Sequence, residues 1–218
     1  MTAITKRKYK SPRQLARQSN IMKTVRTMLE EVGYDGMTIR GLAKRAGVAQ
    51  GTLYNLYGGK DSLVLAAVDD LLSQLTGTAV EEAPGGGIEA IFARSRLIGA
   101  QIESTPRYAD AMTRILFHVG PNDPLVDVLF AGSFPFLKSQ LEAARQNGEV
   151  RPDVDIDLVA RHLVGQQWGV VLLWMMGIIP VEDNGRERQR SEIMTLIAIA
   201  TDKTRKRLQA RLAELDGN

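Results

Sequence analysis

Apolar residues recur at helical spacing along most of this 218-residue chain. Over residues 21–32 they occupy positions i, i+1, i+4, i+7, i+8 and i+11, which lie on one face of an α-helix. The same spacing returns as far as Leu212. No segment alternates apolar and polar residues with a period of two, which is the pattern of a half-buried strand. The chain is therefore predicted to be all-α, with about nine helices.

Capping signals place the first two helices. Ser11 is followed by a proline and, three residues on, by Gln14, and this combination is a capping box. A helix is predicted to begin there and to end at Gly33, since glycine adopts the left-handed conformation that closes many helices. A second, short helix is predicted to begin after Thr38, its N-cap, and to end at Gly47.

The later boundaries depend on local composition. Glycines, a proline and two acidic residues in 77–87 predict a loop that ends near Ile88. Pro135 is expected to kink or break its helix. Residues 163–179 form an apolar run that is shorter than a membrane span and contains two glutamines, so a buried helix is predicted there. The last helix is predicted to run unbroken over 187–215.

Charge is divided unevenly along the chain. Residues 1–60 carry twelve Lys or Arg and three acidic residues, a net charge of +9, whereas the remainder carries −6. A basic end on an acidic body favours a polyanionic partner at that end, although a solvated helix face with a basic tail gives the same balance. Residues 1–10, which end in a basic cluster, are expected to form a disordered arm that reaches an adjacent DNA groove or the backbone.

Composition excludes several kinds of site. The chain has no cysteine, which rules out disulfides, thiolate nucleophiles and Cys-type zinc sites. Its two histidines, His118 and His162, lie far apart in sequence and have no acidic or nucleophilic companions at useful spacing. No catalytic residue, metal or cofactor is expected, and the chain is not expected to be an enzyme. No apolar stretch typical of a signal peptide follows the basic N-terminus, so a cytoplasmic protein without a membrane partner is expected.

Residues 38–57 form a predicted helix-turn-helix. In this motif the second helix enters the major groove of DNA while the first crosses the backbone. Glutamine and asparagine side chains can pair with adenine, and a threonine methyl can touch the methyl of thymine. A glycine at position 51 lets the helix backbone approach the duplex closely. The outer side of the second helix is therefore predicted to contact DNA through Gln50, Gly51, Thr52, Tyr54 and Asn55.

Phosphate contacts are predicted around the same motif. Lys60 begins the fourth predicted helix, where its charge adds to the positive end of the helix dipole. Thr38 and Arg40 begin the first helix of the motif, although Thr38 also serves as a plain N-cap and Arg40 as a solvated side chain. Tyr54 is expected to reach a phosphate or a base, whereas Tyr57 is expected to be mostly buried.

The stretch MTIRGLAKRAGVAQGTLYNLYGGKDSL resembles the DNA-binding signature of the TetR family of transcriptional regulators. The resemblance lies in the order Thr, Ile, Leu-Ala, Ala-Gly-Val, Gly-Thr-Leu-Tyr, an aromatic residue, Lys and Leu, and it covers residues 20–75. It implies a helix-turn-helix domain over 11–58. It also implies a helical effector-binding and dimerisation domain over 59–218, with residues 59–76 as the connecting helix.

The same resemblance implies a mechanism. A homodimer, with an interface formed by helices near 155–176 and 187–215, would place two recognition helices in successive major grooves of a pseudo-palindromic operator. A small apolar effector would bind the acidic body and release the repressor from double-stranded DNA. The connecting helix would carry the change in spacing between the two DNA-binding domains.

Two positions depart from the family pattern. Members often carry Ser or Thr where this chain has Ala49, and many have His where it has Leu56. A hydroxyl at the first position would cap the recognition helix and touch a phosphate, which alanine cannot do. Phosphate affinity is therefore expected to depend more on the neighbouring residues Thr38, Arg40, Tyr54 and Lys60.

Aromatic and polar residues of the body are predicted to line the effector pocket, although aromatic residues at helical spacing are more often part of a core. Gln167 and Trp168 stand out, because a polar pair on a buried helix needs partners. The predicted lining comprises Phe92, Tyr108, Met112, Phe117, His118, Phe130, Phe134, Gln167, Trp168 and Trp174.

Two alternatives stay open on the sequence alone. One is a regulator of the same family without an effector, whose body serves dimerisation or a protein partner. The other is an all-helical enzyme or small-molecule carrier with an incidental basic head. A pocket in the body would count against the first, and a selected palindromic DNA site would count against the second.

Overall fold

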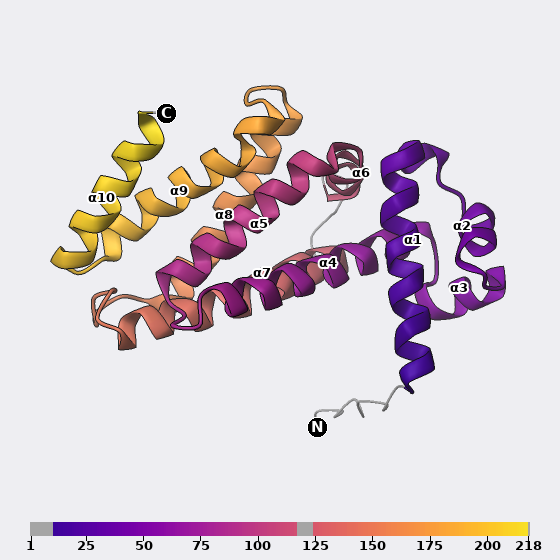
Figure 1. Cartoon of the computed structure of the whole chain (residues 1–218), viewed down its shortest axis with the longest axis horizontal. Helices are drawn as coiled ribbons and strands as arrows, with labels where there is room; N and C mark the ends of the chain where they lie inside the picture. The colour runs from indigo at the N-terminus through magenta and orange to yellow at the C-terminus, as the bar shows by residue number, and fades with distance from the viewer. Residues whose placement is uncertain (1–10, 117–123, 218) are drawn as a thin grey trace. The chain divides into compact units, whose positions relative to one another are not determined.

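The computed structural model describes residues 11–116 and 124–217. These residues form ten α-helices and one short 3-10 helix, η1, and contain no strand beyond an isolated antiparallel bridge between Val150 and Ala200 (Figure 1). The all-α prediction is confirmed, with one helix more than the nine or so expected. The elements are α1 (Pro12–Gly36), α2 (Ile39–Ala46), α3 (Gln50–Tyr57), α4 (Lys60–Glu82), α5 (Ile88–Ser104), α6 (Pro106–Leu116), α7 (Pro124–Gln146), α8 (Ile156–Met175), η1 (Val181–Asp183), α9 (Asn184–Ile199) and α10 (Asp202–Asp216).

The chain divides into two compact units, Met1–Ala67 and Val68–Asn218, called the head and the body below. The division lies inside α4, later than the predicted domain boundary at residue 58. The first turns of α4 belong to the head because they contribute fully buried side chains to it. The buried apolar residues of the head are Ile21, Met22, Val25, Met28, Leu29, Met37, Leu42, Ala43, Ala46, Leu53, Leu63, Val64 and Ala67.

The capping residues of the head act as the sequence predicts. Ser11 and Gln14 form the capping box of α1, and the Thr38 side chain accepts a hydrogen bond from the Gly41 amide at 3.1 Å. Gly47 closes α2 in the left-handed conformation. Gly33, at φ 70°, interrupts α1, but helical backbone resumes and α1 ends at Gly36, so the predicted end at Gly33 is three residues early.

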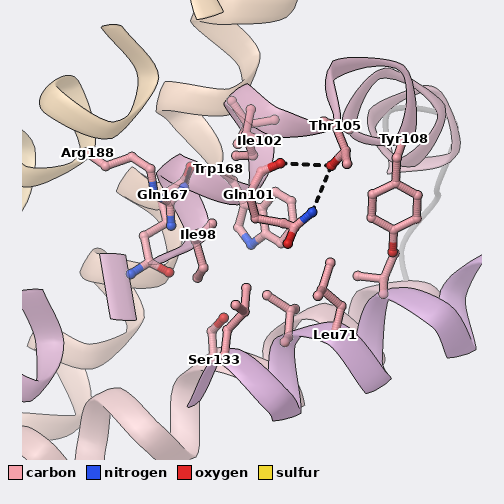
Figure 2. Close-up of a pocket in the computed structure, with 15 residues that line it drawn as sticks. Leu71, Ile98, Gln101, Ile102, Thr105, Tyr108, Ser133, Gln167, Trp168 and Arg188 are labelled. Carbon is pink, nitrogen blue, oxygen red and sulfur yellow. Dashed lines mark hydrogen bonds between the residues drawn. The ribbon is translucent and has the colours of Figure 1, made fainter. Parts of the chain in front are cut away.

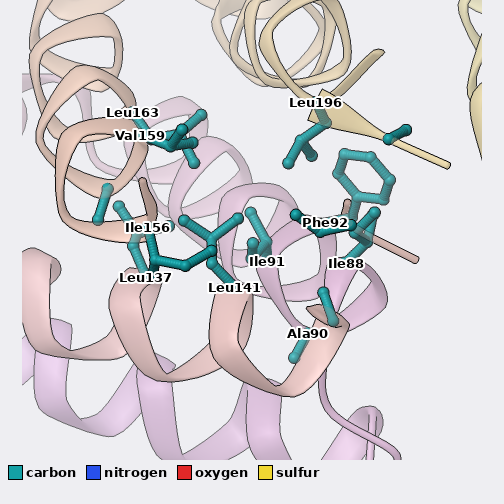
Figure 3. Close-up of a cluster of buried hydrophobic side chains, with 14 of the residues drawn as sticks. Ile88, Ala90, Ile91, Phe92, Leu137, Leu141, Ile156, Val159, Leu163 and Leu196 are labelled. Carbon is teal, nitrogen blue, oxygen red and sulfur yellow. The ribbon is translucent and has the colours of Figure 1, made fainter. Parts of the chain in front are cut away.

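The body packs around α9, which contacts α5, α8 and α10, while α7 packs against α5 and α8. Figure 3 shows the cluster of buried side chains that these helices share. Spacings of three and four residues along each helix bring its apolar side chains to this side. The largest members are Ile88, Ile91, Phe92, Phe136, Leu137, Leu141, Ile156, Leu163, Ile193, Leu196 and Leu208.

The predicted loop at 77–87 is wrong in its first half, because α4 continues to Glu82. Ala79 is fully buried, and the Thr76 hydroxyl accepts a hydrogen bond from Arg94 Nε at 2.9 Å. Packing against the body thus keeps this segment helical despite its glycine and its β-branched residues. The loop itself is confined to 83–87, where Gly86 and Gly87 have positive φ.

By length and composition alone, α4 is long and apolar enough to cross a membrane. A core helix passes the same test, so this is weak evidence for a span. Its apolar residues have other places in the structure: Leu63 and Val64 lie in the core of the head, and Leu71, Leu72 and Leu75 line a cavity in the body.

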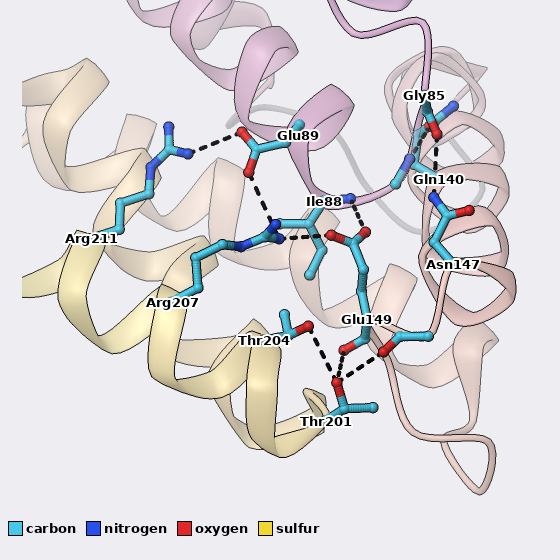
Figure 4. A network of polar contacts seen from close by, with 12 residues as sticks. Gly85, Ile88, Glu89, Gln140, Asn147, Glu149, Thr201, Thr204, Arg207 and Arg211 are labelled. Atoms are coloured by element: carbon cyan, nitrogen blue, oxygen red, sulfur yellow. Dashed lines mark hydrogen bonds and ion pairs between the residues drawn. The ribbon is translucent and has the colours of Figure 1, made fainter.

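The predicted unbroken helix over 187–215 is wrong, since α9 ends at Ile199 and α10 begins at Asp202. Ala200 has extended backbone and pairs with Val150, and the Thr201 amide donates to the Glu149 carbonyl at 3.0 Å (Figure 4). Contacts with the distant turn at Gly148 and Glu149 therefore determine where the helix breaks. The local sequence contains no glycine or proline that would predict the break.

The α7 helix continues through Pro135, so a break there is excluded. Proline removes the hydrogen bond to the carbonyl four residues earlier, at Ala131. Both residues are exposed, so water can satisfy that carbonyl. On the buried side, Arg94 Nη2 donates to the Gly132 carbonyl at 3.0 Å and supports the same turn.

Glu149 joins α5, α7 and α10 near the same turn (Figure 4). Its carboxylate accepts a hydrogen bond from the Ile88 amide at 3.2 Å and pairs with Arg207 at 2.7 Å. Glu149→Ala should lower the free energy of unfolding by about 1–2 kcal/mol, because the first turn of α5 loses an acceptor that no side chain of its N-cap supplies. Urea denaturation followed by circular dichroism measures the loss.

Glu89 provides the matched control, since it pairs with Arg211 at 3.1 Å but its side chain is 50% exposed, against 16% for Glu149. Glu89→Ala should change the free energy of unfolding by no more than about 0.5 kcal/mol. Equal losses in the two variants would contradict a capping role for Glu149.

Candidate functional site

The head carries the predicted helix-turn-helix, in which α2 and α3 are joined by a turn over residues 47–49. In α3, Leu53 is fully buried and fixes the helix against the head, while Tyr54 is 53% exposed on the other side. Gln50, Gly51 and Asn55 are exposed as well, and no described side chain approaches the position of a Cβ at Gly51. The outer side of α3 is thus available to a ligand as large as a duplex.

The other predicted contact residues lie near this surface. Thr38 and Arg40 are exposed at the beginning of α2, and Thr38 caps the helix as well. Thr52 is half-buried, and its hydroxyl accepts a hydrogen bond from Arg17 Nη2 at 3.3 Å. Tyr57, expected to be mostly buried, is also half-buried. DNA contacts by these residues remain predictions.

Lys60 is held in place by an aromatic ring. Its Nζ lies 3.9 Å from the centroid of the Tyr34 ring, and the Tyr34 hydroxyl donates a hydrogen bond to Asp61. Partial burial and this bond to a carboxylate together raise the pKa of Tyr34 to about 12, so the hydroxyl stays protonated and keeps donating. The cation–π contact fixes the ammonium at the beginning of α4, where an anion would meet it.

Arg17 is a functional candidate that the sequence reasoning missed. It is exposed on α1, four residues after the exposed Arg13, so the two side chains share one helix face. Its bond to Thr52 places that face beside α3. The spacing of the two arginines was the available signal.

The N-terminus of α3 has no side-chain cap, because Ala49 occupies the N-cap position. This agrees with the sequence-based expectation that Ala49 cannot cap the recognition helix. Leu56 is 51% exposed, so it presents an apolar surface where a polar residue could have bonded a phosphate.

A second feature is a cavity in the body, enclosed by α4, α5, α6, α7, α8 and α9 (Figure 2). The centre of a water molecule can occupy about 60 Å³ of it, and all its empty space, open solvent included, comes to about 600 Å³. Apolar side chains dominate its walls, and a few polar groups lie among them. The lining consists of Val68, Leu71, Leu72, Leu75, Ile98, Gln101, Ile102, Thr105, Tyr108, Ala109, Ser133, Gln167, Trp168, Val171 and Arg188.

The predicted pocket residues divide into three groups. Tyr108, Gln167 and Trp168 do line the cavity. Phe117 and His118 lie outside the described residues, as does the side chain of Met112. The remaining four predictions, which are Phe92, Phe130, Phe134 and Trp174, are not among the lining residues.

Each of those four rings has another place. Phe92 is buried in the main core, where the Arg211 guanidinium lies 4.2 Å from its ring centroid. Phe134 packs against the same core, and Phe130 stacks on Phe134 at a centroid distance of 4.7 Å. Trp174 packs against the smaller cluster of Ile98, Ile102, Ala109 and Val171. Their aromatic character thus serves packing.

The sequence comparisons match the head to known DNA-binding regulators. The family model described as bacterial regulatory proteins, tetR family, matches residues 21–67. An uncharacterised HTH-type transcriptional regulator of Bacillus subtilis, YezE, is 32% identical over 146 residues, which cover 61% of this chain and 73% of that protein. The HTH-type transcriptional repressor AcnR of Corynebacterium jeikeium is 24% identical over 158 residues, 67% of this chain and 75% of the repressor.

Solved structures share the fold. Thermus thermophilus FadR, described as a TetR family transcriptional repressor in complex with lauroyl-CoA, superposes with a TM-score of 0.67 at 20% identity, over 82% of this chain and 93% of FadR. One family assignment follows from three observations: the helix-turn-helix head, the helical body and the sequence relatives. The chain belongs to the TetR family of DNA-binding transcriptional regulators.

Proposed function

We propose that this protein is a cytoplasmic repressor that binds a pseudo-palindromic DNA operator as a homodimer and leaves it when a small apolar effector occupies the cavity of the body. The exposed outer side of α3, beside a basic surface from α1 and α2, is the observation that carries the DNA-binding part. No enzymatic role is proposed.

Base contacts are assigned to Gln50, Thr52 and Asn55, and backbone contacts to Thr38, Arg40, Tyr54 and Lys60. Gly51 allows the approach of the duplex. The exposed positions of Gln50 and Asn55 support the first group, since neither side chain has a role in the core of the head. The ring contact that holds Lys60 supports the second, since a fixed ammonium loses little entropy on binding a phosphate.

The dimer is assigned to one face of α8 and α9. The apolar run at 163–179 was expected to be buried, yet its second half exposes Leu172, Leu173, Met176 and Ile178. Leu158 and, on α9, Met194 are exposed as well. Several exposed large apolar side chains on two helices that pack together are typical of a protein–protein interface. The exposed side chains of α10 are mostly polar, so the interface is assigned to α8 and α9 without it.

The stripe on α8 has the spacing of a coiled-coil seam. Leu158, Gly165 and Leu172 are separated by seven residues each, and His162, Gly169 and Met176 follow the same period four residues later. Among the described residues, nothing lies within 4 Å of a Cβ built at Gly165 or Gly169. The two glycines therefore leave room for a helix of the partner to approach closely.

Two observations support an effector role for the cavity. Its lining is mostly apolar, and several of its lining residues belong to α4. FadR of Thermus thermophilus is described with an acyl-CoA bound. Here Val68, Leu71, Leu72 and Leu75 of α4 line the cavity, and the preceding turns of the same helix belong to the head. A ligand that displaces α4 can therefore change the spacing of two heads in a dimer. To release DNA, the effector must bind more tightly to the dimer whose head spacing does not fit DNA than to the dimer whose head spacing does.

Gln50→Ala should weaken binding to the selected operator by about 1–3 kcal/mol and relax the base preference at one position of each half-site. Competition binding against operators mutated at single positions measures both effects. Gln209→Ala, at an exposed position of α10, is the control and should leave the base preferences unchanged. A uniform loss over all sequences with Gln50→Ala would indicate a backbone contact instead of base recognition.

A further inference from the structure

Three ionisable side chains are buried together in the body. Arg94 is 1% exposed, Arg188 3% and Glu192 1%. They come from α5 and from successive turns of α9, and the neighbouring polar groups Ser95, Ser133 and Gln167 are also buried. Burial of a charge is costly unless an opposite charge is close, so this group requires an explanation.

The hydrogen bonds of the group leave its charges unbalanced. Glu192 Oε1 accepts from Ser95 Oγ and Gln167 Nε2, each at 2.9 Å. Within the described part of the chain, neither Arg94 nor Arg188 donates to this carboxylate. Arg94 donates instead to Thr76, Gly132 and Ser133, and Arg188 to the Gln167 carbonyl at 3.2 Å.

The net charge of the group is positive in either state of Glu192. Burial raises the pKa of Glu192, and the protonated acid would leave two cations with no anion. Burial and Arg188 lower the pKa of Arg94 to about 10, so Arg94 still carries its charge at neutral pH. One positive charge therefore remains uncompensated if the acid is ionised, and two remain if it is not.

The cavity opens onto this positive group. Arg188, Gln167 and Ser133 are lining residues, and Figure 2 shows Arg188 and Gln167 at the end of the cavity away from Tyr108. Arg188 Nε has no hydrogen-bond partner among the described residues. The walls between the two ends are mostly apolar, with Leu71, Leu72, Ile98, Trp168 and Val171 among them. A ligand that fits must therefore be apolar along its length and supply an acceptor at one end.

We propose that the effector is a hydrophobic monocarboxylate whose carboxylate binds beside Arg188 and supplies the missing negative charge. The guanidinium offers donors in the geometry that suits a carboxylate, and the low-polarity surroundings strengthen the attraction. Gln167 and Ser133 line the same cavity and add polar groups to its wall. This inference rests on the proposed effector role of the cavity and narrows the apolar effector of that proposal to one class.

Three probes with the same ten-carbon chain test the headgroup: decanoate, 1-decanol and decylamine, each used below its micelle concentration. Tryptophan fluorescence reports binding, because Trp168 lines the cavity. Decanoate should bind at least about tenfold more tightly than 1-decanol, as a charged hydrogen-bonded headgroup does in a buried site, and decylamine should bind more weakly than either. Decanoate should also release operator DNA.

Variants of α9 assign the preference to one side chain. Arg188→Met should reduce decanoate binding to the level of 1-decanol, while Arg188→Lys should keep part of the preference. Arg186 is a half-exposed arginine on the same helix as Arg188, and it pairs with Asp183 of η1. Arg186→Met should leave the preference for decanoate intact. Circular dichroism checks that each variant is folded, and the Arg188→Lys variant keeps the test decisive if Arg188→Met does not fold.

The outcomes separate this inference from the proposed function. If 1-decanol binds as tightly as decanoate and also releases DNA, the headgroup inference is overturned and the effector role stands. If none of the probes binds, the cavity does not accept the proposed class of effector and the inference fails, while DNA binding is tested independently. If the Arg188→Met variant kept the full preference for decanoate over 1-decanol, the headgroup inference would also be overturned.

Discussion

Gly165→Arg is expected to convert the dimer into a monomer and to weaken operator binding by about 100-fold or more. Position 165 lies in the middle of the exposed stripe on α8, and a long charged side chain there would occupy the space in which the partner helix packs. A monomer loses the effective concentration that one bound head gives the other. Sedimentation velocity measures the oligomeric state, and fluorescence anisotropy with labelled operator measures affinity.

The same change should not harm the fold of the monomer. In a helix interior arginine is favoured over glycine by close to 1 kcal/mol, and nothing described lies within 4 Å of the new Cβ. Gly77→Arg is the matched control, because Gly77 is exposed and helical in α4, outside the stripe. It should remain dimeric. A dimeric Gly165→Arg protein with normal operator affinity would show that the interface lies elsewhere.

Arg94→Ala is expected to lower the free energy of unfolding by about 3 kcal/mol. The substitution removes donors to Thr76 and Ser133 and to the Gly132 carbonyl, and it leaves a cavity between α4, α5 and α7. Each buried acceptor without a donor costs about 1–3 kcal/mol, and the void adds to this. The smaller repulsion of Arg188 offsets part of the loss, since two buried cations become one. Urea denaturation measures the change.

Arg96 supplies the comparison two residues along α5. It is exposed and pairs with Glu82, so Arg96→Ala should change the free energy of unfolding by no more than about 0.5 kcal/mol. Arg94→Met, which fills most of the volume but cannot donate, should fall between the two. A loss in Arg94→Ala no larger than that in Arg96→Ala would mean that the buried hydrogen bonds contribute little to stability.

The head could be predicted from sequence because its boundaries depend on local chemistry. The caps at Ser11 and Thr38 and the left-handed glycines at 33 and 47 act within a few residues, so the order of the chain contains the information. The exposed side of α3 follows from one buried residue, Leu53, and the helical period.

The body was harder because distant contacts decide its boundaries. The break between α9 and α10 depends on Thr201 meeting the backbone of Gly148 and Glu149, and the extension of α4 to Glu82 accompanies the packing that buries Ala79. Neither contact has a local signal. An aromatic residue likewise does not reveal whether its neighbours are a cavity or a core, which explains why Phe92 and Phe134 were assigned to the pocket.

Arg188 was missed for a different reason, although a signal was present. The segment around it is rich in charged residues, and only aromatic residues and their neighbours were considered as pocket lining. Yet Asn184, Arg188, Glu192 and Leu196 recur at intervals of four, and all four are buried. The buried face of α9, apolar near its C-terminus, thus continues through polar residues toward its N-terminus. The period of four that runs through Leu196 on α9 therefore predicts that Arg188 faces the interior, at the polar end of the cavity.

Selection of bound sites from random-sequence duplex DNA by the full-length protein tests the central claim most directly. A homodimer with α3 in successive major grooves should enrich an inverted repeat whose half-site centres lie about one helical turn, 10–10.5 base pairs, or a multiple of it apart. The enriched site should bind one or more dimers. Enrichment of no sequence, or of a single unrepeated site that binds a monomer, would contradict the account.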